Sequence, residues 1–185
     1  MTPLNWSILI IAILVVGAAV VFFIRTRTKN LKSKFGPEYE RAVGEQGSTF
    51  KAERELENRA KRVEKFPIHS LSPEESDQFA AEWRTTQENF VDDPRNAVAA
   101  ADDLVHRTMK ARGYPISGEF DERAADLSVD HAFVVEHYRA AHEIAARDVR
   151  NAATTEELRL AMKHYRALFE DLLERHVQET TGVRR

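Results

Sequence analysis

The densest group of side chains able to do chemistry lies in residues 123–131, which read RAADLSVDH. Asp126 and Asp130 place two carboxylates beside the imidazole of His131, and general acid–base catalysis uses these side-chain types. The same pattern fits two helix ends joined by capping groups, with Ser128 or Asp130 as the N-cap of a helix that starts near His131. We favour this structural interpretation. Asp126, Asp130 and His131 remain the candidate catalytic residues of an alternative, enzymatic one.

Because the chain has no cysteine, histidines are the main candidate ligands for a transition-metal site. Two ligands on one helix face must lie three or four residues apart, and no two histidines have that spacing. The one usable half-site is Asp102 with His106, at positions i and i+4, which we interpret as a hydrogen-bonded surface pair. We therefore expect no metal and no cofactor. The seven histidines are His69, His106, His131, His137, His142, His164 and His176.

Motifs of the common enzyme classes are missing from the sequence. There is no Walker loop, no GxGxxG, no HExxH and no GxSxG, and no Glu-x-x-His of the kind that di-iron bundles need. After residue 30 the chain carries 24 basic and 30 acidic side chains, a net charge of −6. An acidic region is a poor nucleic-acid binder, because phosphate neutralisation needs a basic face. The sequence favours a non-enzymatic protein without a nucleic-acid partner.

Helix-start signals predict the elements that position these residues. Ser72-Pro73-Glu74-Glu75 and Thr154-Thr155-Glu156-Glu157 read as capping boxes, and Asp93-Pro94 reads as an N-cap followed by proline. Residues 97–109 then repeat inward-facing side chains at i, i+3, i+4 and i+7. The predicted core positions are Ala97, Val98, Ala101, Leu104, Val105, Thr108 and Met109 in this helix, and Leu158, Ala161, Met162, Tyr165, Leu168, Phe169 and Leu172 in the helix after Thr154. Because no alternating β pattern occurs, we predict an all-α fold with a bundle of three or four main helices over residues 68–185.

Two further breaks divide that bundle. Gly113 suits the residue just past a helix C-terminus, and a short helix is expected over residues 119–126. After the break at residues 127–130, the next helix is expected to bury Phe133, Val134, Tyr138, Ala141, Ile144 and Ala145.

One tetrapeptide recurs on two consecutive predicted helices. His137-Tyr138-Arg139-Ala140 returns 27 residues later as His164-Tyr165-Arg166-Ala167. A duplicated hairpin is one interpretation. We favour the simpler one, in which both helices present an aromatic residue inward beside a polar flank.

Residues 35–67 are predicted to form a charged juxtamembrane stalk. Gly36-Pro37 breaks the chain, Pro37 suits a first helical position, and Gly44 and Gly47 are expected to interrupt the helix that follows. Residues 50–66 then form a long helix with charge on most faces. Its apolar stripe is narrow, so we expect a stalk or a weak coiled-coil-like segment rather than a core helix. That stripe consists of Ala52, Leu56, Ala60 and Val63.

Residues 7–24 read SILIIAILVVGAAVVFFI and contain no charge. A helix of this length spans about 27 Å, close to the hydrocarbon core of a bilayer. We predict that residues 1–34 form an uncleaved transmembrane helix with its flanks, because the segment before the run has no Lys or Arg and no small-residue cleavage site follows it. The predicted membrane flanks are Trp6 on one side and Arg25, Arg27, Lys29, Lys32 and Lys34 on the other.

The cations at the C-terminal end of the run set the expected orientation. The positive-inside rule places them, and all that follows, in the cytoplasm. We interpret them mainly as topology determinants. Contact with anionic lipid head groups is a second interpretation.

The segments FVDDPRNAVAAADDLV (90–105) and RAADLSVDHAFVVEHYRAAH (123–142) resemble a family of uncharacterised bacterial proteins with an N-terminal transmembrane helix and a helical C-terminal region. The resemblance extends from Phe35 onward. It implies a bacterial, membrane-associated protein and carries over no activity, cofactor or catalytic residue.

These observations together predict a single-pass protein of the bacterial inner (plasma) membrane. Its partners would be the lipid bilayer and another protein, which its cytoplasmic helical domain would bind or scaffold. Two alternatives stay open: a membrane-attached enzyme that uses the Asp126, Asp130 and His131 cluster, and a domain exported to the cell envelope.

Overall fold

A computed structural model describes residues 3–149 and 152–181, with side chains over 11–149 and 152–173. All the regular structure in this part of the chain is α-helical, as the sequence predicts. The chain divides into two compact units, residues 1–56 and 57–185, with the boundary inside one helix. The helices are α1 (Pro3–Phe35), α2 (Pro37–Gln46), α3 (Thr49–Val63), α4 (Pro73–Asn89), α5 (Pro94–Ala111), α6 (Phe120–Leu127), α7 (Val135–Asp148) and α8 (Thr155–Thr181).

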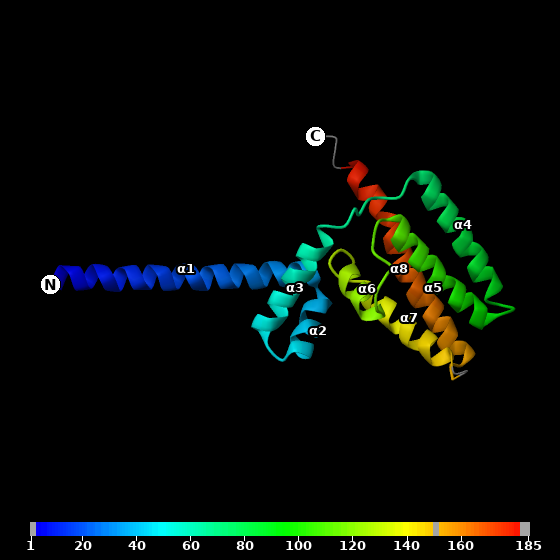
Figure 1. Cartoon of the computed structure of the whole chain (residues 1–185), viewed down its shortest axis with the longest axis horizontal. Coiled ribbons are helices and arrows are strands. Elements are labelled where there is room, and N and C mark those ends of the chain that lie inside the picture. Colours follow the sequence, from blue (N-terminus) through cyan, green and yellow to red (C-terminus); the bar gives the residue numbers. More distant parts are fainter. Residues whose placement is uncertain (1–2, 150–151, 182–185) are drawn as a thin grey trace. The chain divides into compact units, whose positions relative to one another are not determined.

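Helix α1 carries the apolar run predicted to cross a membrane (Figure 1). Within the described residues, the part from Ile11 to Phe35 is the one helix long and apolar enough to do so. Every side chain from Ile11 to Thr26 is exposed, and Phe22 and Phe23 expose 73% and 70% of their surface. With 33 residues, α1 is about 50 Å long, so its C-terminal third extends beyond a hydrocarbon core of about 30 Å.

The C-terminal end of α1 belongs to a small packed core in the first unit. Gly36 ends α1 with a φ of 46°, Pro37 opens α2, and Gly47 caps α2 in the left-handed region with a φ of 61°. Gly44 lies inside α2, so the expectation that it interrupts this helix is wrong. Because nothing lies within 4 Å of an added Cβ there, Gly44 marks no close approach. The buried apolar residues of this unit are Leu31, Phe35, Tyr39, Ala42, Ala52 and Leu56.

A buried carboxylate joins the three helices of this unit. Glu53 on α3 is only 4% exposed, and its Oε1 accepts hydrogen bonds from Thr28 on α1 at 2.6 Å and from Tyr39 on α2 at 3.0 Å. Burial, reinforced by Glu53, raises the pKa of Tyr39 to about 12. The helix expected to be a free stalk is therefore packed, with Ala52 and Leu56 completely buried. The apolar stripe is thus buried on one side of α3, where Glu53 also contacts α1 and α2.

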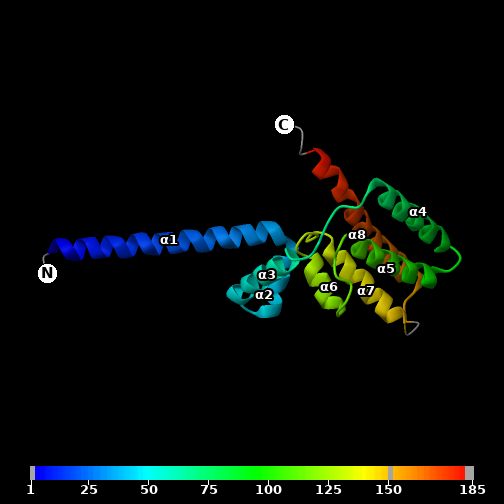
Figure 2. The same ribbon diagram turned by 45° about the horizontal axis from the view of Figure 1, so that its top comes forward.

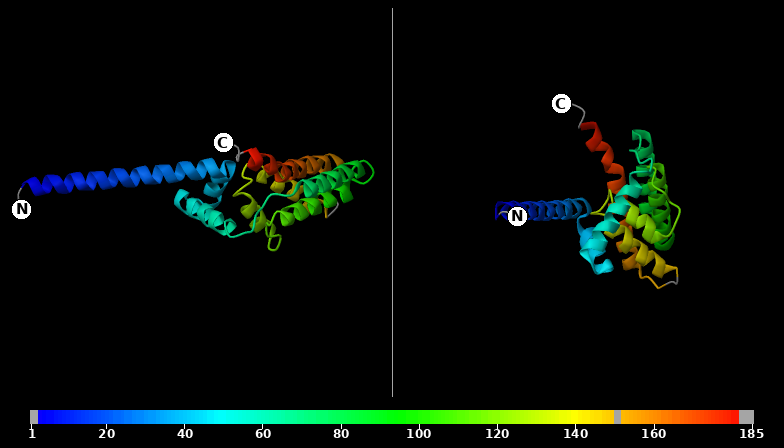
Figure 3. Two further views of the ribbon diagram at one scale, coloured as in Figure 1. Left: turned by 90° about the horizontal axis from the view of Figure 1, so that it is seen from above. Right: turned by 60° about the vertical axis from the view of Figure 1, so that its left-hand side comes forward.

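The second unit is a bundle in which α8 packs against both α7 and α5, α4 packs against α5, and the short α6 lies beside α7 (Figures 1 and 2). The views in Figure 3 show α5, α7 and α8 running side by side. Ser72 forms the predicted capping box with Glu75, Asp93 caps α5, and Thr154 pairs with Glu157 at the start of α8. The start signals of α4, α5 and α8 are confirmed.

The bundle core follows the predicted helical faces. All seven predicted positions of α5, and all seven of the helix after Thr154, are buried. Trp83 on α4 stacks on Phe169 of α8 with ring centroids 4.8 Å apart. The buried residues in these two predicted sets are Ala97, Val98, Ala101, Leu104, Val105, Thr108 and Met109, and Leu158, Ala161, Met162, Tyr165, Leu168, Phe169 and Leu172.

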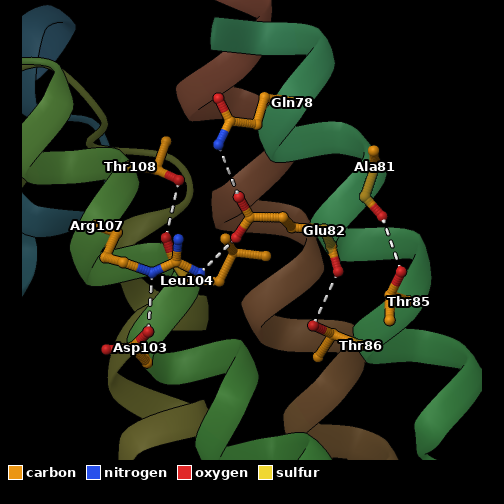
Figure 4. Close-up of polar contacts among 9 residues, drawn as sticks. All are labelled: Gln78, Ala81, Glu82, Thr85, Thr86, Asp103, Leu104, Arg107 and Thr108. Atoms are coloured by element: carbon orange, nitrogen blue, oxygen red, sulfur yellow. Dashed lines mark hydrogen bonds and ion pairs between the residues drawn. The ribbon is translucent and has the colours of Figure 1, made fainter.

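A forked ion pair on the surface holds α4 against α5 (Figure 4). Arg107 on α5 donates to Glu82 on α4 at 2.6 Å and to Asp103 on its own helix at 2.9 Å. Gln78 donates to the other oxygen of Glu82 at 3.2 Å. The hydrogen bond from Arg107, helped by the weaker one from Gln78, holds the pKa of Glu82 below its usual range, and burial opposes this shift.

Gly113 ends α5 in a Schellman motif, which confirms its predicted role. Tyr114 N–H donates to Met109 at 3.0 Å, and Gly113 N–H donates to Lys110 at 2.9 Å. The φ of Gly113 is 88°, and a Cβ at this position would lie 2.2 Å from the carbonyl oxygen of Pro67. Only glycine fits, and its small size lets the loop around Pro67 pack against the end of α5.

Candidate functional site

Each of the three candidate catalytic residues has a structural partner from another segment of the chain. Asp126 is 4% exposed and accepts a hydrogen bond of 2.6 Å from Nε of Arg62 on α3. Burial raises the pKa of Asp126, and Arg62 opposes that shift. This carboxylate is paired with a guanidinium, which gives Asp126 a structural role.

Asp130 and His131 both lie beside Tyr114, whose ring centroid is 5.8 Å from that of His131. Asp130 Oδ2 accepts a hydrogen bond of 2.9 Å from the hydroxyl of Tyr114. The imidazole of His131 is completely buried, and its Nδ1 is in very short contact with Asp171 on α8. Both residues therefore attach the segment between α6 and α7 to neighbouring elements.

The predicted capping roles in this segment are wrong. Helix α7 begins at Val135, and its N-cap residue Val134 makes no side-chain cap. Ser128 donates its hydroxyl to the carbonyl of Ala125 at the end of α6. A turn around His131 delays the helix start by four residues and leaves Phe133 71% exposed rather than buried.

Asp102 and His106, predicted to be a hydrogen-bonded surface pair, belong to a larger polar cluster. Oδ2 of Asp102 lies 3.6 Å from Nδ1 of His106. On the other side of the ring, Nε2 of His106 lies 2.9 Å from the hydroxyl of Tyr138 on α7. Burial raises the pKa of Tyr138 to about 12, although Arg123 opposes the shift. The imidazole of His106 therefore lies between the hydroxyl of Tyr138 on α7 and the carboxylate of Asp102 on its own helix.

Two more residues complete this cluster, which we call the α5–α7–α8 polar cluster: Asp102, His106, Tyr138, His142 and Tyr165. Burial, followed by the charge of Asp102, raises the pKa of Tyr165 on α8. His142 stacks on Phe120 with ring centroids 3.7 Å apart. Burial lowers the pKa of His142, and Asp102 opposes that shift.

A groove of about 560 Å³ lies beside the polar cluster on the bundle surface. Asp102 and His142 line it, together with the ion pair of Arg95 and Asp148 and several small apolar residues. The phenols of Tyr138 and Tyr165 are completely buried, so a ligand in the groove meets a carboxylate and an imidazole edge but neither phenol. The cluster is therefore arranged to tie three helices together.

No group of three or more potential metal ligands occurs among the residues with described side chains. The two tyrosines of the repeated tetrapeptide both point inward, as expected, and the histidines that precede them meet. His137 Nδ1 lies 3.0 Å from His164 Nδ1, across the interface of α7 and α8. Sequence spacing did not reveal this pair, because its members are 27 residues apart; the repeated tetrapeptide on two adjacent helices was the available signal.

The predicted membrane flank divides into two groups. Arg27 lies 3.9 Å from the buried Glu53, and Lys32 pairs with Glu40 at 2.9 Å and lies over the ring of Tyr39. Arg25, Lys29 and Lys34 are exposed. The side chain of Trp6 lies outside the described residues. Part of the basic flank is thus used to fold the first unit.

No family model, no curated protein and no solved structure matches this chain. Its function must therefore be argued from its own geometry.

Proposed function

We propose that this protein is a single-pass protein of the bacterial plasma membrane whose helical region binds another protein on the cytoplasmic side. The observation that carries the proposal is the continuity of α1. Its N-terminal part exposes an uninterrupted apolar surface, while Leu31 and Phe35 near its C-terminal end are buried in the first unit. Cleavage within or just after the apolar run would cut into a helix that the first unit needs, which supports a retained anchor over a removed signal.

The orientation rests on charge. Five cations follow the apolar run within ten residues, and MTPLNW before it has none. This asymmetry favours a cytoplasmic second unit.

Cysteine labelling tests the orientation cleanly, because the chain has no cysteine of its own. A single Gln87→Cys change places a thiol at an exposed position of α4, and Thr2→Cys places one before the apolar run. We expect a membrane-impermeant maleimide to label Thr2→Cys in spheroplasts and to label Gln87→Cys only after lysis. Labelling of Gln87→Cys in intact spheroplasts would support the exported alternative instead.

Protein binding is supported by the structural partners that account for the predicted catalytic residues. Asp126, Asp130 and His131 contact Arg62, Tyr114 and Asp171 in turn. We expect crosslinking in intact membranes, followed by purification, to recover a specific protein with the full chain. A chain that ends after residue 56 should not recover it. Equal recovery with both chains would contradict binding by the second unit.

A further inference from the structure

Two imidazoles from consecutive helices face each other at the surface of the bundle. His137 on α7 and His164 on α8 have ring centroids 5.1 Å apart and ring planes 29° apart. Their Nδ1 atoms are separated by 3.0 Å, so one ring donates a proton to the other. Both side chains are partly exposed, and neither takes part in the polar cluster or in an ion pair described above.

The separation of the two nitrogens suits a metal ion in place of the shared proton. Imidazole nitrogens bind first-row divalent metals at about 2.0–2.1 Å. Two nitrogens 3.0 Å apart then subtend about 95° at the metal by simple trigonometry on that bond length. This is close to the right angle between adjacent ligands in square-planar or tetragonal sites and well below the tetrahedral angle. Cu²⁺ and Ni²⁺ favour such tetragonal sites with nitrogen and oxygen ligands.

Both rings are accessible to an ion from solvent. His137 and His164 are each partly exposed. This exposure leaves the remaining coordination positions open to water.

We propose that His137 and His164 form a two-ligand site for Cu²⁺ or Ni²⁺, with water in the other coordination positions. On binding, the ring that donates its Nδ1 proton changes tautomer and carries that proton on Nε2. Both Nδ1 lone pairs then point to the metal. Because the ligands come from α7 and α8, the ion bridges these helices and stabilises the folded bundle by mass action. The site is independent of the proposed membrane and partner-binding roles.

The test uses the full chain in detergent micelles, with Ni²⁺ and Cu²⁺ alone as probes. Calorimetric titration should show one ion bound at this site, and the variants His137→Gln and His164→Gln test whether both imidazoles hold it. Each variant should weaken binding at this site by roughly 10²-fold, because the second ligand no longer acts intramolecularly. His69→Gln is the matched control, since the exposed ring of His69 has its Nδ1 2.8 Å from the carbonyl oxygen of Pro67 and lies in a different segment of the chain. It should bind like the unmodified chain.

A second measurement decides the matter even if a variant does not fold. Electron paramagnetic resonance of Cu²⁺ on the unmodified chain should show two equivalent imidazole nitrogens in the equatorial plane. A spectrum with a single imidazole nitrogen, or with amine and amide nitrogens, would overturn the proposal. So would titrations in which folded His137→Gln and His164→Gln bind both metals as the unmodified chain does.

Discussion

Thr28 on α1 donates a hydrogen bond of 2.6 Å to Glu53 on α3, 25 residues away. Through this contact, the helix that carries the apolar run is part of the first folded unit. Tyr39 donates to the same carboxylate oxygen at 3.0 Å, and Arg27 lies 3.9 Å from the other oxygen. The carboxylate therefore sets how α1 meets α2 and α3.

Removal of one hydroxyl group tests the contact of Tyr39 with Glu53. Tyr39→Phe should destabilise the first unit by about 1.5–3 kcal/mol, because the bond it removes ends on a charged, buried acceptor. Hydrogen exchange of the full chain in micelles should show faster exchange in α2 and α3. Glu45→Gln, at the exposed end of α2, is the control and should leave exchange unchanged outside its own turn. Unchanged protection in Tyr39→Phe would contradict the role of Glu53.

The pair of Tyr114 and Asp130 replaces the capping role that the sequence suggested for Asp130. Tyr114→Phe and Asp130→Ala should each destabilise the bundle, and a double-mutant cycle should give a coupling of about 0.5–3 kcal/mol. Asp130→Ser should resemble Asp130→Ala, because the shorter side chain does not reach the hydroxyl of Tyr114. A capping residue would instead tolerate serine. Additive single changes, measured by urea unfolding, would contradict the pairing.

Gly113 and Gly44 form a matched pair of glycines. Gly113→Ala should destabilise the bundle by at least about 1–3 kcal/mol, since it combines a positive φ with a close contact to Pro67. Gly44→Ala should stabilise α2 by about 0.4–1 kcal/mol, because the site is helical and open. Melting temperatures of both variants check this. If both substitutions shifted the melting temperature by the same amount in the same direction, the different environments assigned to Gly113 and Gly44 would be contradicted.

Two histidines make the bundle sensitive to acid. The pKa values of His142 and His164 are lowered in the folded chain from the usual 6.5, mainly by burial. The unfolded state therefore binds more protons than the folded state once the pH falls below about 6.5. Above that pH, these two histidines should not change the free energy of unfolding. Below it, the free energy of unfolding should decrease until the pH reaches the pKa values of the folded state.

Urea unfolding across this pH window measures the effect. His164→Gln should flatten the dependence. An increase in stability on acidification through this window would contradict the assigned shifts.

Local signals predicted most of the fold. Ser72, Asp93, Thr154 and Gly113 occupy the helix ends that their side chains or φ angles suit, because capping depends on a few neighbouring residues. The start of α7 escaped prediction, since Asp130 is held by Tyr114 from another segment rather than by its own backbone. Packing across helices overrides a local preference there.

The candidate site was less predictable than the fold. Asp102 and His106 were visible as a pair on one helix, but the partners that give them a role, Tyr138 and Tyr165, come from α7 and α8. The contact between His137 and His164 likewise depends on the register of two helices. No single-helix spacing encodes such a register.

The central claim is that α1 stays attached to the folded chain as its membrane anchor. The most direct test is the intact mass of the protein in alkali-washed membranes. We predict that the mass of the protein in the membrane pellet accounts for a chain that still contains the apolar run of residues 7–24. A species that begins within or after the apolar run and is recovered in the soluble fraction would contradict the account.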